Sequence, residues 1–553
     1  MRGKKLREIV GGSALIESMF GHDDQVDERE TLVQQAKKVI FGSRENDVKI
    51  VYCAAGGATM TFANDPEGSL LDQWISQWPL WVAENLPGLQ LAQAWVKSDI
   101  VNRDFKGSVV KALAARLEVA KHQATLDLPR ANPVLDLGIR GGVAVDTADF
   151  GGSGKQFADL TSLRQSEAAH GTLGDRLKIR FFSEDSQNFK LPYDHEQISG
   201  EGYLAVVHID GNRVGRLLSK FGSDLDRFAV FSRALSESTR RAVQEASDRA
   251  LLEDENENAL GRPIVVGGDD VTAVMRADKA IYFTARFIKT FEEETRARLG
   301  DMPELKEALG EARCLTASAG IAFIRRNHPF SDGYHLAEAL CKRAKRAWAN
   351  SKPTRAHELA EGLGPSMVAF QRVTSSLADL DWPKIDGLKY RVGPYYLSNY
   401  AYTEFAEDRK FPCLNTLEYL VDALQRPEVS NSRLRGLIDL VSEARTETLD
   451  SLQSFSPARA QAEWERICQI QEERESHDDP FWTGNLLEEL KNLITQSPNE
   501  KTWRDTPWTK VWRDLSAEGD WCDYGSPWVD AYDLVGAGAV TSETLKQRQS
   551  QGV

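Results

Sequence analysis

The stretch YLAVVHIDGNR, residues 203–213, followed by PIVVGGDDVTAVM, residues 263–275, decides the fold of the middle of the chain. The first stretch is a run of apolar and β-branched residues that ends on Asp210 before a Gly-Asn turn, which predicts a strand. The second places two apolar runs on either side of a Gly-Gly pair, which predicts a hairpin with a tight turn. A helical pattern over residues 214–252 connects them.

The pattern after this hairpin completes a familiar order of elements. We expect a helix over 279–298, a strand over 314–324 and a helix over 334–350. Strand, helix, hairpin, helix and strand make the β-α-β-β-α-β order of a ferredoxin-like fold.

A similar order is expected near the N-terminus. An apolar helical stretch opens the chain, VKIVYCAAGGATMTF (48–62) predicts a second Gly-Gly hairpin, a Trp-rich helix is expected over 70–81 and a strand over 89–96. The repeated order predicts an internal duplication. The fold class expected is α+β, with two ferredoxin-like domains and a C-terminal α-helical domain.

Four segments are expected. Residues 1–130 form the first domain, 131–200 a Gly-rich connector with some local structure, 201–375 the second domain and 376–553 the helical domain. Helical spacing in the last segment is shown by Leu414, Leu417, Val421 and Leu424, and by Leu434, Leu437 and Val441. Seven of the 13 tryptophans lie between residues 464 and 528, where we expect them to pack this domain together.

Composition excludes several classes of protein. The 553 residues allow three or four domains, and a net charge of −15 disfavours binding to duplex DNA unless a local basic patch overrules it. Six cysteines lie far apart without C-x-x-C spacing, so we expect neither structural zinc nor disulfides. The lack of a long apolar run or a signal peptide predicts a cytoplasmic protein without membrane contact.

Three carboxylates are expected to meet in the second domain. In a β-α-β-β sheet the first and third strands are neighbours, so Asp210 at a strand end lies beside Asp269 and Asp270 at the hairpin tip. Like charges this close need a compensating cation, and carboxylates suit Mg²⁺ or Mn²⁺. These three residues are therefore the candidate catalytic and metal-binding residues for two divalent ions and a nucleoside triphosphate.

Backbone groups near these acids suit a phosphorylated ligand. Gly267 and Gly268 permit a tight turn and leave room for a nucleotide against the hairpin. The loop Gly211, Asn212 and Arg213 leads into an expected helix N-terminus, where free N–H groups favour phosphate. All five are candidate nucleotide-binding residues.

Two more candidates come from later in the chain. Ser318 lies on the strand TASAG (316–320), and the following helix carries the basic residues Lys342, Arg343, Lys345 and Arg346. Lys345 is the candidate for neutralising the β- and γ-phosphates. A solvated helix face is the alternative for this basic run.

These motifs resemble those of a known family. LAVVHIDGNRVGRLL, VVGGDDVTAV, LTASAGIAF and HLAEALCKRAKRAW are similar to successive motifs of the polymerase-like palm in the large subunit of type III CRISPR effector complexes. That palm is itself similar to GGDEF nucleotide cyclases. KLREIVGGSALIESMF and VKIVYCAAGGATMTFA resemble the family's first, non-catalytic palm, and LKYRVGPYYL with the helices after it resembles its C-terminal region.

The resemblance implies an activity. In that family the second palm binds two ATP with divalent metal and joins them through 3′-5′ linkages into cyclic oligoadenylate. It implies that Asp210, Asp269 and Asp270 hold the metals, that Gly268 admits a nucleotide and that Lys345 binds triphosphate.

Some family features are expected to be missing. His22-Asp23 and His477-Asp478 are isolated, so we expect no HD nuclease domain and no DNA cleavage. The connector lacks the cysteines of the family's zinc module, which puts assembly with the usual CRISPR subunits in doubt. The first palm reads Gly56-Gly57-Ala58-Thr59 and has no metal ligands at its tip.

The leading hypothesis is a metal-dependent nucleotidyltransferase that joins NTPs, with ATP first, into a cyclic or short linear second messenger for antiviral defence. An effector protein responding to the product is the expected partner, and a homodimer is possible. The alternatives are a non-catalytic nucleotide-binding scaffold subunit of a CRISPR-type ribonucleoprotein, with CRISPR-type subunits or RNA as partners, and a nucleotide sensor that moves the C-terminal domain.

Overall fold

A computed structural model gives the structure of the chain. It describes most of residues 6–374, and the longest gaps are 21–29, 98–107, 123–145, 149–155, 170–177 and 350–363. Beyond residue 374 it describes residues 384–385, 388–389, 393–397, 414, 417, 421 and 527–539.

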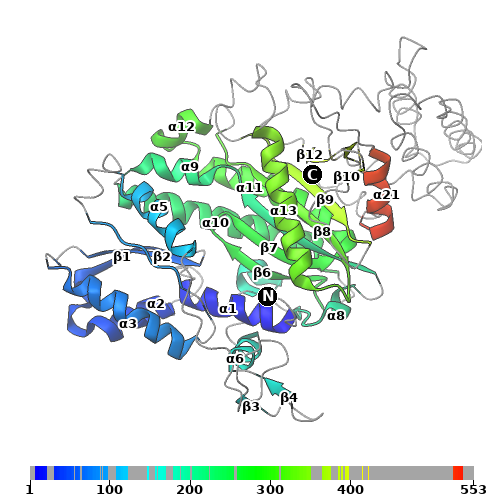
Figure 1. Cartoon of the computed structure of the whole chain (residues 1–553). Coiled ribbons are helices and arrows are strands. Elements are labelled where there is room, and N and C mark those ends of the chain that lie inside the picture. The colour runs from blue at the N-terminus through cyan, green and yellow to red at the C-terminus, as the bar shows by residue number, and fades with distance from the viewer. Residues whose placement is uncertain are drawn as a thin grey trace, which may run out of the picture.

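The β-α-β-β-α-β segment expected in the middle of the chain is present (Figure 1). Its elements are β5 (Tyr203–Gly211), α10 (Leu225–Ala250), β6 (Gly261–Gly267), β7 (Asp270–Arg276), α11 (Ala277–Leu299) and β8 (Ala317–Arg325). The strands lie in the order β8-β5-β7-β6, and each is antiparallel to its neighbour. A mixed α+β palm is therefore confirmed for this part of the chain.

Two further strands widen this sheet. β9 (Met367–Arg372) pairs in parallel with β8, and β12 (Tyr395–Tyr396) pairs with β9, which gives the order β12-β9-β8-β5-β7-β6. α13 (Phe330–Ala349) makes the crossover from β8 to β9, as parallel strands require. α12 (Pro303–Leu309) lies between α11 and β8 in the chain.

Helices cover both faces of the sheet. On β5, Ala205, Val207 and Ile209 face the core formed with α10 and α11. The alternate residues Leu204 and Val206 face α13 and α1 (Leu6–Phe20) on the other side. Each such large apolar side chain contributes about 1.5–3 kcal/mol when fully buried, so the sheet is the stable centre of the described part.

The helix expected over 214–252 is interrupted. α9 (Val214–Leu218) and the 3₁₀ turn η3 (Ser219–Phe221) end at Gly222, whose φ is 57°. α10 then begins after Asp224, whose carboxylate accepts a hydrogen bond from the Arg227 backbone N–H at 3.0 Å. A left-handed glycine followed by an acidic N-cap is the ordinary signal for one helix ending and another beginning.

The N-terminal segment forms a small unit around its hairpin. Its elements after α1 are α2 (Leu32–Phe41), η1 (Gly42–Asp47), β1 (Val48–Ala54), β2 (Gly57–Phe62), α3 (Ser69–Asn85) and α5 (Val109–His122). β1 and β2 pair as the expected antiparallel hairpin, alone in their sheet among the described residues.

The strand expected over 89–96 is wrong. Residues 91–97 have no strand hydrogen bonding, and the Trp95 carbonyl instead accepts a hydrogen bond from the Arg116 side chain on α5 at 2.8 Å. A strand needs a ladder partner, and β1 and β2 pair only with each other in the described sheet. The complete order of a first ferredoxin-like domain is therefore not seen in the described residues.

The expected connector carries short elements. They are β3 (Asp146–Ala148), β4 (Gln156–Ala158), α6 (Leu160–Ala169), η2 (Glu184–Ser186) and α8 (His195–Ser199). β3 and β4 pair with each other. α6 packs on α1 so closely that a Cβ on Gly11 would meet the Gln165 carbonyl oxygen at 1.5 Å.

Few residues of the expected helical domain are described. Leu414, Leu417 and Val421 are helical and buried, whereas the rest of the spacing pattern and the Trp-rich segment before residue 527 lie outside the described residues. β10 (Lys384–Ile385) pairs with β11 (Leu388–Lys389). No described helix is long and apolar enough to cross a membrane.

The helix α21 (Pro527–Ala537) packs on the β9–β12 edge of the sheet (Figure 1). The buried Asp530 carboxylate accepts hydrogen bonds from the Gly393 N–H at 3.1 Å and the Tyr395 hydroxyl at 2.7 Å. Arg372 of β9 pairs with Asp533 at 3.4 Å. This helix closes one edge of the palm sheet.

Candidate active site

The three expected carboxylates lie together at one end of the sheet. Asp210 is the Cα partner of Asp270 across β5 and β7. Gly267 pairs with Asp270, so Gly268 and Asp269 form the two-residue turn between them. Antiparallel pairing thus brings residues about 60 positions apart in sequence to neighbouring places.

The turn that carries Asp269 is held from two sides. Gly268 has a φ of 58°, which glycine adopts without strain, and its carbonyl accepts a hydrogen bond from the Thr239 hydroxyl of α10 at 2.5 Å. The Gly211 N–H donates to the Asp269 carbonyl at 3.1 Å. A Cβ on Gly211 would lie 2.9 Å from the Asp269 Cβ, so glycine is needed there for close approach.

Burial and mutual repulsion weaken the acidity of two of these groups. Burial, and then the charge of Asp210, raise the pKa of Asp269 to about 7. Burial followed by the charges of Asp210 and Asp269 likewise raises the pKa of Asp270 to about 7. Although the Asp270 side chain as a whole is half-exposed, its Oδ1 is buried and has no hydrogen-bond partner.

His208 belongs to this site, although the sequence reasoning did not select it. Its Nδ1 lies 3.0 Å from the Thr272 hydroxyl oxygen and 3.4 Å from Asp270 Oδ1. Burial lowers the pKa of His208, which favours a neutral ring beside the acids. The signal was present in the sequence, because residues 208 and 210 of one strand share a face.

Lys345 reaches the same place from α13. Its ammonium lies 2.5 Å from Asp210 Oδ2 and donates to the Gly211 carbonyl at 2.7 Å. The neighbouring basic residues point elsewhere: Lys342 pairs with Glu338 at 2.6 Å, and Arg343 donates to the Gly393 carbonyl at 3.1 Å. Lys345 therefore lies beside Asp210, where its partner in this structure is a carboxylate, and its contact with phosphate stays a prediction.

Asn212 and Ser318 are buried and bonded to protein groups. The Asn212 amide donates to the Thr316 hydroxyl at 2.9 Å and the Pro365 carbonyl at 3.1 Å, and its oxygen accepts from the Ser318 hydroxyl at 2.8 Å. Their side chains therefore fix the strand ends, and direct contact of either with a nucleotide stays a prediction.

The expected phosphate site at a helix N-terminus is weaker than the sequence indicated. Arg213 has a φ of 55° and precedes α9, which has only five residues. So short a helix aligns few peptide dipoles. Any phosphate contact of Gly211, Asn212 and Arg213 would rest on individual N–H groups and on the guanidinium, and stays a prediction.

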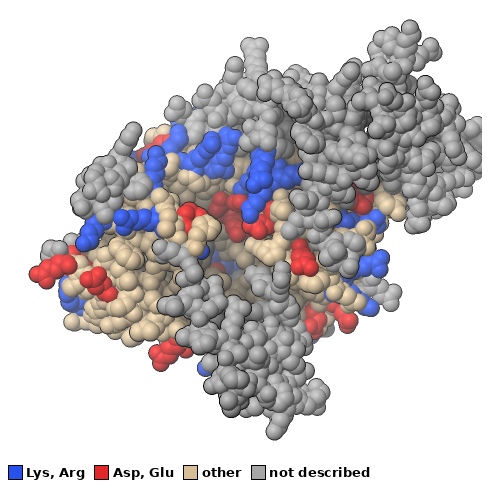
Figure 2. All heavy atoms as spheres, in the orientation of Figure 1, with Lys and Arg blue, Asp and Glu red and all other residues tan. Residues whose placement is uncertain are grey.

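The surface over this end of the sheet carries both signs of charge. Figure 2 shows Asp and Glu side chains gathered near the middle of the visible face, with Lys and Arg side chains beside and above them. A site for a metal-bound triphosphate needs such a pairing, because the cation requires carboxylates and the phosphates require cations.

The N-terminal hairpin lies against α10 near this site. The Tyr52 ring of β1 meets the Phe228 ring edge to face, with centroids 6.0 Å apart, and Lys49 pairs with Asp226 at 2.9 Å. Burial raises the pKa of Tyr52, and the charge of Asp269 adds to that rise.

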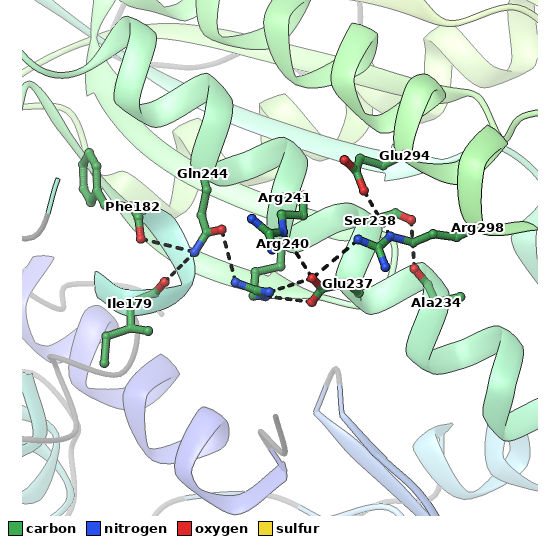
Figure 3. A network of polar contacts seen from close by, with 10 residues as sticks. All are labelled: Ile179, Phe182, Ala234, Glu237, Ser238, Arg240, Arg241, Gln244, Glu294 and Arg298. Atoms are coloured by element: carbon green, nitrogen blue, oxygen red, sulfur yellow. Dashed lines mark hydrogen bonds and ion pairs between the residues drawn. The ribbon is translucent and has the colours of Figure 1, made fainter. Parts of the chain in front are cut away.

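A polar network holds α10 at this junction (Figure 3). The Glu237 carboxylate accepts hydrogen bonds from Arg240 at 2.6 and 2.9 Å and from Arg241 at 3.3 Å. Gln244 accepts from Arg240 at 3.2 Å and donates to the Ile179 carbonyl at 2.9 Å. Arg240 is buried, so these contacts fix the helix that also positions the Gly268 turn.

Residues 203–352 match the family model for Cas10/Cmr2, second palm domain. This segment is similar to the second palm of Cas10/Cmr2 proteins. The predicted resemblance to the large subunit of type III CRISPR effector complexes is thereby confirmed, and it rests on the segment that holds all three acids and Lys345.

Solved structures of Csm1 are similar to the chain at low identity. A Csm1–Csm4 cassette in complex with one ATP is 14% identical with a TM-score of 0.48, and the match covers 98% of this chain and 68% of that chain. A Csm1–Csm4 cassette in complex with cA4 has the same identity and coverage with a TM-score of 0.43. Csm1 of T. onnurineus is 13% identical with a TM-score of 0.36, and the match covers 86% and 68% of the two chains. No curated protein matches the sequence.

The residues at this end of the palm sheet fit a divalent cation in donor type. Among the described residues, no group of three or more His, Cys, Asp or Glu side chains is placed to hold a metal ion in this structure. However, the three carboxylates are neighbours at one end of the sheet, and the buried Asp270 Oδ1, which lies 3.4 Å from His208 Nδ1, has no hydrogen-bond partner and is a hard oxygen donor. Lys345 contacts Asp210 Oδ2, one of the two oxygens with which Asp210 could bind a cation.

Proposed function

We propose that the palm is a metal-dependent nucleotidyltransferase that joins nucleoside triphosphates, with ATP the first candidate, into a cyclic or short linear oligonucleotide. The observation that carries the proposal is the meeting of Asp210, Asp269 and Asp270 in a segment that matches the Cas10/Cmr2 second palm. A degenerate palm would be expected to lose such acids, because their mutual repulsion disfavours the folded state without a cation.

The three carboxylates would hold one or two Mg²⁺ or Mn²⁺ ions. Such ions supply Lewis acidity, which lowers the pKa of an attacking 3′-hydroxyl and stabilises a pyrophosphate leaving group. Gly268 leaves the backbone open to a nucleotide, and Lys345 is placed to meet phosphate oxygens beside Asp210. His208 would keep Asp270 oriented by contact with Oδ1.

The acceptor nucleotide needs a second surface, and we place it on the N-terminal hairpin. Joining two nucleotides requires a 3′-hydroxyl held in line with the α-phosphate of the donor. β1 lies against α10 on the side of Asp269, and a Cβ on Gly57 would meet no atom within 4 Å, so there is open space beside the turn. In GGDEF-type enzymes a second subunit fulfils this role, and a homodimer is the alternative here.

Gly57→Trp tests the acceptor surface. The indole would fill the open space beside the turn, so turnover should fall while donor binding in the presence of Mn²⁺, measured by calorimetry, stays the same. Full turnover in a normally folded variant would move the acceptor site elsewhere, and ultracentrifugation would then show whether a dimer provides it.

The domain arrangement is part of the proposal. Residues 1–130 would be a first palm without metal ligands, 131–200 a connector, 201–375 the catalytic palm and 376–553 a helical domain.

The partners proposed are an effector protein that responds to the product and, less directly, CRISPR-type subunits or RNA. Csm1 is a precedent for such subunits, since its solved structures contain Csm4.

A non-catalytic nucleotide-binding scaffold is the second candidate. The Lys345 ammonium beside Asp210 favours it, because a salt bridge at 2.5 Å neutralises a carboxylate that catalysis would need for a cation. Co-purification of RNA and partner proteins, without product from any NTP, would support the scaffold.

Product analysis tests the enzyme. The purified protein is incubated with each of the four NTPs and Mg²⁺ or Mn²⁺, and products are identified by mass spectrometry. The double variant Asp269→Ala/Asp270→Ala should make no product and, without metal, should melt at or above the wild-type temperature, because two mutually repelling acids are gone. Asp301→Ala removes an exposed acid and serves as control. Wild-type turnover in a folded double variant would refute the catalytic assignment.

A further inference from the structure

The contact between α13 and the three carboxylates Asp210, Asp269 and Asp270, here called the acid site, does more than hold the helix in place. We propose that Lys345 is an internal counter-ion of the acid site, which exchanges between Asp210 and substrate phosphate and so couples cation binding to nucleotide binding. The inference rests on the proposed function for the identity of the nucleotide, and concerns the regulation of that same site.

The geometry places one ammonium where a cation would compete for it. Lys345 contacts both Asp210 Oδ2 at 2.5 Å and the Gly211 carbonyl at 2.7 Å, two hard oxygen acceptors at one strand end. These are the donor types that Mg²⁺ and Mn²⁺ prefer. The ammonium and a divalent ion therefore compete for Asp210 Oδ2 and for the Gly211 carbonyl.

The exchange needs a side-chain movement alone. α13 sits so close to β8 that a Cβ on Gly320 would meet the Ala337 carbonyl oxygen at 1.9 Å, so the helix backbone is fixed against the sheet. Lysine, by contrast, has four flexible methylene groups and a point charge that needs no fixed geometry. The Lys345 side chain is only 24% exposed, so its reach is limited to the site itself.

The neighbouring cations on α13 do not share this role. Lys342, one turn earlier, is 57% exposed and pairs with Glu338 on its own helix. Arg343 donates to the Gly393 carbonyl on the other side of the helix. Lys342 is therefore a matched control: it has the same charge and the same helix, and in this structure its partner is not Asp210.

Competition at Asp210 creates coupling. A triphosphate that attracts the Lys345 ammonium frees Asp210 for the cation, and a cation at Asp210 frees the ammonium for phosphate. By linkage, each ligand raises the affinity for the other by the same factor. Cation binding without nucleotide is correspondingly weak.

The test measures Mn²⁺ alone. Binding to the full chain is followed by electron paramagnetic resonance at pH 8.5, above the pKa of about 7 of Asp269 and Asp270, with no nucleotide present. Lys345→Met should bind Mn²⁺ at least about tenfold more tightly than wild type, since a competing unit charge is removed at contact distance. Lys342→Met should bind as wild type does, and Asp210→Asn/Lys345→Met should lose the gain. Unchanged or weaker binding by Lys345→Met would overturn the proposal.

A second measurement needs no variant. Acetylation of lysines in the wild-type chain by an amine-reactive ester, read by peptide mass spectrometry, should rise severalfold at Lys345 when Mn²⁺ is added and stay constant at Lys342. No rise at Lys345 under saturating Mn²⁺ would refute the exchange. Neither assay contains an NTP, so failure to make product would leave this result standing, and product formation without the Mn²⁺ effect would refute only the counter-ion role.

Discussion

Gly320 sets the height of α13 above the sheet, and Gly320→Ala should raise it. An added Cβ would lie 1.9 Å from the Ala337 carbonyl oxygen, 2.5 Å from the Cys341 backbone nitrogen and 2.9 Å from the Leu340 Cβ. Ordinary contact begins near 3.4 Å, and two of these three atoms belong to the backbone, which cannot rotate away. The helix must therefore move outward by about 1.5 Å at its closest point.

The expected magnitude follows from this displacement. Overpacking of a tight core costs about 1–3 kcal/mol, and a clash with backbone atoms belongs at the upper end of that range. The same movement would carry the backbone of Lys345 away from Asp210, so its side chain would have to extend further to keep the contact. We expect faster opening of α13 together with a lower melting temperature.

Hydrogen exchange followed by mass spectrometry is the direct assay, because it reports on α13 separately from the rest of the chain. Gly215→Ala is the control, since a Cβ there meets nothing within 4 Å and alanine favours the helix. If Gly320→Ala showed wild-type exchange in α13 and wild-type melting, the close packing deduced for this contact would be wrong.

Two further predictions concern buried charges. Burial raises the pKa of Glu292 to about 8, so between about pH 4.5 and 8 the folded state binds the extra proton and stability falls as pH rises. Glu292→Gln keeps a hydrogen bond to Ser366 and should reduce the difference in melting temperature between pH 5 and pH 9. An unchanged difference would contradict the raised pKa of Glu292. Arg262 is fully buried, with one hydrogen bond to the Pro192 carbonyl at 2.6 Å and two nitrogens without partners. Arg262→Met should therefore melt within a few degrees of wild type or higher. Arg262→Ala should melt at a lower temperature, because it leaves a cavity. An equal drop in melting temperature in both variants would show that the charge itself stabilises the fold.

The palm was predictable because its signals are local. The apolar run before Asp210 and the Gly-Gly turn each specify one element, and the ferredoxin-like order then fixes which strands are neighbours. That topology brings the three acids close together. The sequence indicates Lys345 as the residue that neutralises the β- and γ-phosphates. The structure places its ammonium beside Asp210, and its contact with phosphate stays a prediction.

The remaining features depend on contacts that a sequence does not display. The break at Gly222 and Asp224 had a local signal that the longer helical period hid. The strand expected over 89–96 failed because strand formation needs a partner, and none pairs with it in the described sheet. That Lys345 contacts Asp210 rather than open solvent depends on the closeness of α13 and β8, which a single glycine allows.

The docking of α21 has a consequence for the order in which the chain folds during synthesis. The helix lies far downstream of β9 and β12 in sequence, yet Asp530 and Asp533 satisfy Tyr395 and Arg372 at the sheet edge. A nascent chain therefore presents this edge of the sheet without its contacts to α21 until the ribosome has made Pro527–Ala537. Open edges pair readily with other chains, so translation speed through the intervening segment, and chaperones that shield such edges, should influence how much of the protein reaches its folded state.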